Sequence, residues 1–166
     1  MVAILGYSRE QIFAAVKDMY TAVAEAPDSP FHFPIGRTAS DAAGYPPDQL
    51  EALPGNVLES FVGVGYPFLG EAIRPGDTTL DIGAGAGGDS LIAGRLVGPS
   101  GRVVALDLTP AMTRKLGETV QQSGADNVSV LQASAESIPI ADESVDSITS
   151  NGALNLVPNK RKAVAE

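Results

Sequence analysis

Two carboxylates and a run of glycines stand close together in the middle of the chain. Asp81 lies inside a short apolar run, and Asp107 ends a second one. Between them the chain reads G-A-G-A-G-G from position 83 to position 88. Glycine permits a sharp turn and lets a ligand approach the backbone without a Cβ in the way. A carboxylate at the end of the following strand can accept two hydrogen bonds from a ribose diol. The pattern indicates a nucleotide-binding site.

Asp81 narrows the kind of nucleotide that we expect. Gly83, Gly85 and Gly88 fit the dinucleotide pattern G-x-G-x-x-G, which alone would suit an NAD-dependent oxidoreductase. A carboxylate two residues before the first glycine would repel a pyrophosphate. It suits a ligand with a cationic amino group, such as the methionine end of S-adenosylmethionine. Asp81 therefore favours an S-adenosylmethionine site over the NAD site of an oxidoreductase.

The elements that must position these residues alternate between strand and helix. Apolar runs predict four strands, at 78–82, 103–106, 127–132 and 145–150. Helical spacing predicts two helices between them, at 90–97 and 110–123. Asp107 then stands at the carboxyl end of the second strand, where open α/β sheets bind ligands. The predicted fold class is α/β, a Rossmann-like, doubly wound, mostly parallel sheet.

Residues 1–65 have a different sequence pattern from residues 66–166. Ser8 and Gln11 have the spacing of a capping box and predict a helix that runs to about Ala24. Segments that follow prolines predict further short helices near 47–53 and 57–61. We interpret the N-terminal part as a helical cap over the ligand site, although a helical extension that only covers the sheet is the alternative.

The composition excludes several classes of protein. The chain has 166 residues, of which 44% are hydrophobic, and this is enough for one compact domain. Its net charge of −9 argues against a nucleic-acid or anionic-membrane partner. It has no cysteine, so it can form neither a disulfide nor a thiolate metal site. We see no signal peptide and no apolar run of membrane-spanning length, so a cytoplasmic location is expected.

Several motifs resemble those of a known family. The runs D-I-G-A-G-A-G and A-L-D-L-T are similar to the cofactor motifs of class I S-adenosylmethionine-dependent methyltransferases. Within that group the chain most resembles the arsenite-methyltransferase-like branch, through G-V-G-Y-P at 63–67, L-D-L-T-P-A-M at 106–112 and S-N-G-A-L-N-L-V-P-N-K at 150–160. The resemblance implies S-adenosyl-L-methionine as the cofactor and a small molecule as the methyl acceptor.

The resemblance also assigns expected roles to individual residues. Asp81 and the glycine loop would hold the methionine portion, and Asp107 would accept from the ribose hydroxyls. Leu108 and Met112 would pack near the adenine, and Ser134 and Ala135 would meet its edge. Asn151 and Gly152, after the fourth strand, would flank the sulfonium. The expected cofactor-binding residues are therefore Asp81, Gly83, Ala84, Gly85, Gly87, Asp107, Leu108, Met112, Ser134, Ala135, Asn151 and Gly152.

No catalytic residue is identified from the sequence. Methyl transfer is an in-line displacement at an already activated carbon, so positioning and desolvation can carry much of the catalysis. His32 is the only histidine and lies between two phenylalanines. We interpret it as a packed residue rather than a general base. Tyr20 and Tyr66 are the tyrosines that we would test.

Three positions depart from the family pattern. Ser134 stands where the family usually carries an aspartate that meets the adenine amino group, and the neighbouring Glu136 is interpreted as a solvated turn residue. Arsenite enzymes carry cysteines in place of Val64 and Gly152, and those thiolates bind trivalent arsenic. Arsenite methylation by that mechanism is therefore not expected. Gly152 instead suggests room for a larger organic acceptor, or a glycine required by the backbone.

The predicted sheet has four strands, whereas the family has seven. The fourth strand would be an open apolar edge, and such edges pair readily with other chains. The chain is therefore interpreted as a fragment, as a short protein that forms a homodimer, or as half of a split enzyme whose partner chain covers the edge. The alternative to an active methyltransferase is a truncated pseudo-methyltransferase that serves as a non-catalytic or regulatory subunit.

Overall fold

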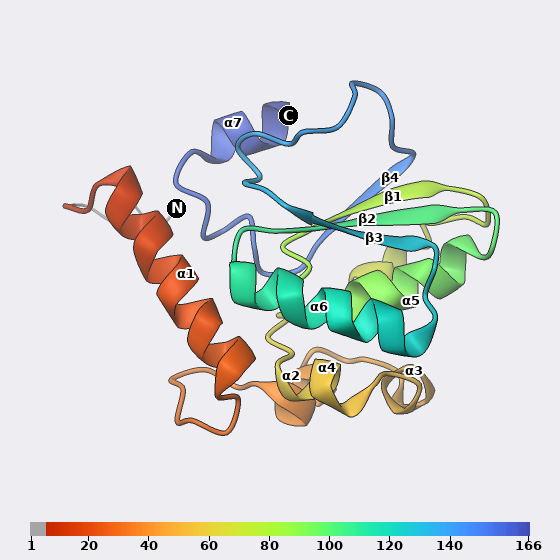
Figure 1. Ribbon diagram of the computed structural model, residues 1–166, viewed down its shortest axis with the longest axis horizontal. Coiled ribbons are helices and arrows are strands. Elements are labelled where there is room, and N and C mark those ends of the chain that lie inside the picture. Colours follow the sequence, from red (N-terminus) through yellow and green to blue (C-terminus); the bar gives the residue numbers. More distant parts are fainter. Residues whose placement is uncertain (1–5) are drawn as a thin grey trace.

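A computed structural model describes residues 6–166 and contains one parallel sheet (Figure 1). The sheet has the order β3-β2-β1-β4. Its strands are β1 (Thr78–Ile82), β2 (Arg102–Asp107), β3 (Val128–Gln132) and β4 (Ser147–Ser150). In the register of the sheet, Asp81 of β1 lies between Ala105 of β2 and Thr149 of β4. All four predicted strands are present, and the predicted Rossmann-like fold class is confirmed.

Helices cover both faces of the sheet. Helices α5 (Gly88–Val97) and α6 (Pro110–Ser123) lie side by side below the sheet in Figure 1, and α7 (Lys160–Ala165) lies above it. Alternate residues of the strands feed two cores, as the period of a strand requires. Val103 and Ala105 pack in the core on the side of α5 and α6. Leu80 and Leu106 pack in the opposite core, which α7 joins through Ala163.

The N-terminal part is helical, as predicted. It contains α1 (Arg9–Glu25), which runs along the left of Figure 1, and α2 (Gly36–Ala42), α3 (Pro47–Glu51) and α4 (Gly55–Glu59), which lie below α5 and α6 there. The 3-10 helix η1 (Pro67–Gly70) follows, just beyond the predicted boundary. The capping box of Ser8 and Gln11 is present at the start of α1. Helix α2 was not predicted, because it is short and begins at a glycine. The boundary near residue 65 stays a prediction, and residues 1–5 of the predicted cap lie outside the described residues.

Strand β4 forms one edge of the sheet. It pairs with β1, and within residues 6–166 no strand pairs with its other side. The side chain of Ile148 on this strand is 60% exposed. The predicted open apolar edge is therefore present in the described part of the chain. No helix of residues 6–166 is long and apolar enough to span a membrane.

Candidate cofactor and methyl-transfer site

A cavity of about 90 Å³, partly open to solvent, lies at the carboxyl ends of the strands. Five parts of the chain form the walls: α1, the loop before η1, the ends of β1 and β2, the turn after β3 and the loop after β4. The lining residues that carry the argument below are Phe13, Val16, Tyr20, Gly85, Asp107 and Ser134.

Most of the expected cofactor residues line this cavity. Eight of the twelve do so: Gly83, Gly85, Asp107, Leu108, Ser134, Ala135, Asn151 and Gly152. Ala84 lines a smaller adjoining cavity of about 40 Å³, which shares Gly83, Gly85 and Asn151 with the larger one. Asp81, Gly87 and Met112 line neither cavity. Met112 is fully buried in the core on the side of α5 and α6, so its observed contacts are with that core.

Asp107 connects the end of β2 with the glycine loop. One carboxylate oxygen, Oδ2, accepts from the backbone N–H of Gly85 at 2.9 Å. The other, Oδ1, accepts from the backbone N–H of Thr109 at 2.7 Å. Burial raises the pKa of Asp107, although these hydrogen bonds oppose the rise. Each oxygen of an ionised carboxylate has a second acceptor site, so Asp107 can still receive two hydroxyl groups from the cavity.

The glycines of the loop are required for different structural reasons. A Cβ on Gly83 would meet the Cβ of Ala153 at 2.1 Å, and a Cβ on Gly87 would meet Leu116 Cδ1 at 2.2 Å. Gly83 and Gly87 are therefore required by packing as well as by their positive φ angles. Gly85 also has a positive φ of 56°, but a Cβ there would meet no atom within 4 Å. The open space beside Gly85 is the part of the loop that a ligand can approach most closely.

Asp81 lies behind the glycine loop and is 2% exposed. Its carboxylate accepts from Ser90 Oγ at 2.6 Å and from Thr149 Oγ1 at 3.0 Å. Burial, together with the nearby carboxylate of Asp89, raises the pKa of Asp81 to about 7. The side chain thus makes its hydrogen bonds within the protein, and its predicted contact with the methionine amino group stays a prediction.

Asp89 was not singled out from the sequence, yet it is the centre of a buried network. It is 8% exposed in the first turn of α5 and accepts from Tyr45 Oη and from Asn151 Nδ2, the latter at 3.0 Å. Burial raises its pKa, which the two hydrogen bonds oppose. Burial and the Asp89 carboxylate in turn raise the pKa of Tyr45. A carboxylate in the first turn of a helix whose other residues are mostly apolar or small is the signal that could have identified this position.

The side-chain amide of Asn151 is fully used by neighbouring protein groups. Its Oδ1 accepts from the backbone N–H groups of Val64 and Gly65, at 2.8 and 3.2 Å. Its Nδ2 lies within hydrogen-bond distance of the Gly65 carbonyl, Tyr45 Oη and the Asp89 carboxylate. Asn151 therefore fastens the loop at 63–65 to the end of β4. Its predicted place beside the sulfonium stays a prediction.

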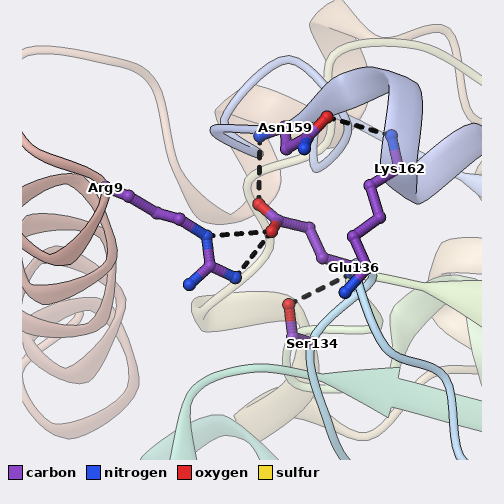
Figure 2. Close-up of polar contacts among 5 residues, drawn as sticks. All are labelled: Arg9, Ser134, Glu136, Asn159 and Lys162. Atoms are coloured by element: carbon purple, nitrogen blue, oxygen red, sulfur yellow. Dashed lines mark hydrogen bonds and ion pairs between the residues drawn. The ribbon is translucent and has the colours of Figure 1, made fainter.

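The interpretation of Glu136 as a solvated turn residue is wrong. Its side chain is 1% exposed and accepts from Arg9 and from the backbone N–H of Asn159 (Figure 2). The backbone N–H of Glu136 donates to Ser134 Oγ at 3.1 Å, which shapes the turn after β3. The Ser134 hydroxyl keeps its own proton for donation, so it can serve as a donor at the cavity wall.

Helix α1 forms a wall of the cavity. Phe13, Val16 and Tyr20 line it, and this favours the interpretation of the N-terminal part as a cap over the site. Burial, with a contribution from the charge of Asp107, raises the pKa of Tyr20. His32 is exposed, packs edge-on against the Phe33 ring and does not line the cavity. The preference for packing over catalysis at His32 is consistent with this placement.

The two positions at which the resembled arsenite enzymes carry cysteine lie next to each other here. A Cβ on Gly152 would lie 3.5 Å from Val64 Cγ1, an ordinary van der Waals contact. Neither position has a thiol in this chain. Gly152 also has a φ of 81°, a left-handed conformation that favours glycine. Within residues 6–166 no group of acidic or histidine side chains is arranged to hold a metal ion.

Comparison with known proteins agrees with this geometry. The sequence model of a family described as "Methyltransferase domain" matches residues 73–166. The arsenite methyltransferase of Halobacterium salinarum is 37% identical over 125 residues, which are 75% of this chain and 32% of that protein. The ubiquinone/menaquinone biosynthesis C-methyltransferase UbiE of Klebsiella pneumoniae is 38% identical over 93 residues, or 55% of this chain and 37% of that protein.

A solved structure extends the likeness to the fold. It is the structure of CrArsM, an arsenic(III) S-adenosylmethionine methyltransferase from Chlamydomonas reinhardtii, with a TM-score of 0.67 and 31% identity. The match covers 74% of this chain and 44% of CrArsM. The chain thus spans about a third of the length of the curated relatives that it matches. It belongs to the methyltransferase-domain family, as a class I, arsenite-methyltransferase-like member.

Proposed function

We propose that this chain binds S-adenosylmethionine and forms the cofactor-binding part of a methyltransferase for a small organic acceptor. The observation that carries the proposal is the pairing of Asp107 with Gly85 at the mouth of the cavity. The Asp107 carboxylate has free acceptor sites for a ribose diol. The open space at Gly85 lets the ligand approach the backbone of the loop closely. Family membership and the arsenic(III) S-adenosylmethionine methyltransferase among its structural neighbours support the choice of cofactor.

The other wall residues suit the remaining parts of that cofactor. Leu108 offers apolar contact beside the nucleoside, and the Ser134 hydroxyl offers a donor to an adenine ring nitrogen. Burial raises the pKa of both Asp81 and Asp89 behind the glycine loop, and a ligand with a positive charge on that side would stabilise their ionised forms. The cofactor supplies the activated methyl group. The protein contributes orientation and exclusion of water, so a dedicated base is not obligatory.

The acceptor is proposed to be an organic molecule. Relatives include an arsenite methyltransferase, but this chain has no cysteine with which to hold trivalent arsenic. The side of the cavity near Gly152 is bordered by apolar groups from Ala153, Leu156 and Val62. An acceptor with an apolar body fits these walls.

Calorimetric titration with S-adenosylhomocysteine tests the proposal. We expect micromolar binding by the chain and loss of measurable binding in Asp107→Ala, with an unchanged circular dichroism spectrum. Asp142→Ala is the matched control, because Asp142 is exposed and lies outside the cavity. A folded chain that does not bind would contradict the proposal and favour the alternative of a non-catalytic subunit. Titration with NADH checks the oxidoreductase interpretation, for which we expect no binding.

A further inference from the structure

Glu136 joins three segments that are far apart in the sequence (Figure 2). Its Oε2 accepts from Arg9 Nε at 3.0 Å and from Arg9 Nη2 at 2.6 Å, at the start of α1. Its Oε1 accepts from the backbone N–H of Asn159 at 3.0 Å, and Asn159 caps α7 through Lys162 N–H. One carboxylate therefore holds α1, the turn after β3 and the segment that leads into α7.

This ion pair differs from the other two of residues 6–166. Arg37–Asp41 and Arg114–Glu25 have both partners at least half exposed. In Arg9–Glu136 the carboxylate is 1% exposed and the guanidinium 52% exposed. Burial alone would raise the pKa of Glu136, but the bonds from Asn159 and Arg9 outweigh it and lower that pKa. Exposed ion pairs contribute little to stability. Of the three pairs, Arg9–Glu136 is therefore the one that we expect to stabilise the fold.

The segments that Glu136 joins are walls of the same cavity. Phe13, Val16 and Tyr20 of α1 line one side, and Leu156 and Val157 line another. The turn that contains Ser134 and Ala135 lies between them and precedes Glu136 directly. The hydrogen bonds of Glu136 to Arg9 and Asn159 therefore connect three segments that each contribute to the cavity wall.

The two ends of α1 are anchored differently. At the C-terminal end, Lys115 of α6 donates to the Ala24 carbonyl at 3.1 Å, and Val23 is fully buried in the core. At the N-terminal end, Ser8, Arg9 and Glu10 are exposed. The guanidinium of Arg9 lies 4.7 Å from the centre of the Phe13 ring, which orients it toward Glu136. Arg9–Glu136 is therefore the polar contact that fixes the N-terminal half of α1 to the Rossmann-like part.

We propose that Arg9 and Glu136 form a latch that holds the N-terminal half of α1 across the cavity, and that opening this latch controls how fast the cofactor enters and leaves. Glu136 is a positioning residue, since it acts through α1 and the segment before α7. The inference rests on the proposed function for the identity of the ligand. The latch itself is a property of the protein without ligand.

Stopped-flow measurement of S-adenosylhomocysteine dissociation tests the gating. Loss of the latch in Arg9→Ala is expected to speed dissociation about tenfold, since a lid that opens more often releases its ligand faster. Arg37→Ala is the matched control, because it also removes an arginine from an ion pair but one that is exposed and remote from the cavity. Arg9→Lys keeps the positive charge and is expected to restore most of the slow dissociation, whereas Arg9→Met is not.

Amide hydrogen exchange separates a failure of the latch from a failure of the proposed function. Without ligand, Arg9→Ala is expected to exchange faster in the first half of α1, with unchanged exchange in α5 and β1. If wild-type chain does not bind S-adenosylhomocysteine, the proposed function fails, and exchange alone decides whether the latch exists. Unchanged exchange in α1 would overturn the latch. Faster exchange with an unchanged dissociation rate would overturn the gating.

Discussion

The Asn151 side-chain amide lies 3.0 Å from the Asp89 carboxylate and so connects the end of β4 with the first turn of α5. The same amide accepts from the backbone of Val64 and Gly65. The end of one strand, the start of one helix and a loop of the cap therefore meet at one side chain. The position of the loop at 63–65, which directly follows the cavity-lining Val62, is held by hydrogen bonds to this residue.

Removal of the Asn151 amide is expected to destabilise the protein. Asn151→Ala leaves the partly buried partners without their hydrogen bonds, and we expect the free energy of unfolding to fall by about 1–3 kcal/mol. Asn56→Ala serves as a control, because Asn56 makes a single side-chain bond to Thr119 and should cost about 1 kcal/mol. Urea unfolding measures both. Equal losses in the two variants would show that the network adds nothing beyond one hydrogen bond.

Gly85 is expected to matter for binding more than for folding. In Gly85→Ala the new methyl group occupies the open space beside the loop, and we expect the affinity for S-adenosylhomocysteine to fall at least about tenfold. Gly124→Ala is the matched control. Gly124 also has a positive φ and open space around its Cβ position, but it ends α6 and does not line the cavity.

Both variants carry the same backbone strain, on the order of 1–3 kcal/mol. Their thermal unfolding temperatures should therefore fall by similar amounts, while calorimetric titration should detect weaker binding in Gly85→Ala alone. Normal affinity in Gly85→Ala would place the ligand away from the glycine loop.

Asp81 is expected to make stability depend on pH. Its pKa is raised from the ordinary value of 3.8 to about 7, so the folded protein binds more protons than the unfolded chain between these values. Stability from this group is therefore full at low pH and is lost as the pH rises toward 7. Asp81→Asn removes the titrating group, and the fall in unfolding free energy between pH 4 and pH 7 should be less steep.

The comparison needs an exposed carboxylate as a reference. Asp142→Asn changes the same charge on the surface and should leave the slope as it is in the wild type. Urea unfolding at a series of pH values provides the slopes. Parallel curves for Asp81→Asn and the wild type would mean that folding does not raise the pKa of Asp81.

The free edge of β4 is expected to support association between copies of the chain. Ile148 is exposed on this edge, and exposed apolar edges pair with other strands. We propose that the isolated chain forms a homodimer through β4. Ile148→Lys should shift sedimentation velocity profiles from dimer to monomer at micromolar concentration, whereas Leu69→Lys, at an exposed apolar residue away from the edge, should not. A monomeric wild type would refute the proposal.

Local sequence patterns were sufficient to predict the fold class and its main strands and helices. Apolar runs and glycines predict β1 and α6 with the bounds that are observed, because a strand or helix is set mainly by its own residues. The same patterns place Asp107 at the end of β2 and Gly85 beside it. These two residues meet because the register of parallel strands brings neighbouring carboxyl ends together.

The connections between distant residues could not be predicted in this way. Asn151 lies 106 positions from Tyr45 and 62 from Asp89, and no local pattern indicates which side chains will face each other after folding. Glu136 was misjudged for the same reason. A glutamate in a polar turn is usually solvated, and its burial depends on Arg9, which the chain brings from the other end.

The Arg9–Glu136 pair also sets the order in which the molecule can be completed. Its partners are separated by 127 positions, so the ribosome finishes α1 long before it delivers Glu136. A contact of such long range forms late, because the entropy of closing the intervening chain is lost first. Phe13, Val16 and Tyr20 therefore face an incomplete cavity wall until residues 134–157 have been synthesised, and the ligand cavity forms only after both distant parts of the chain are present.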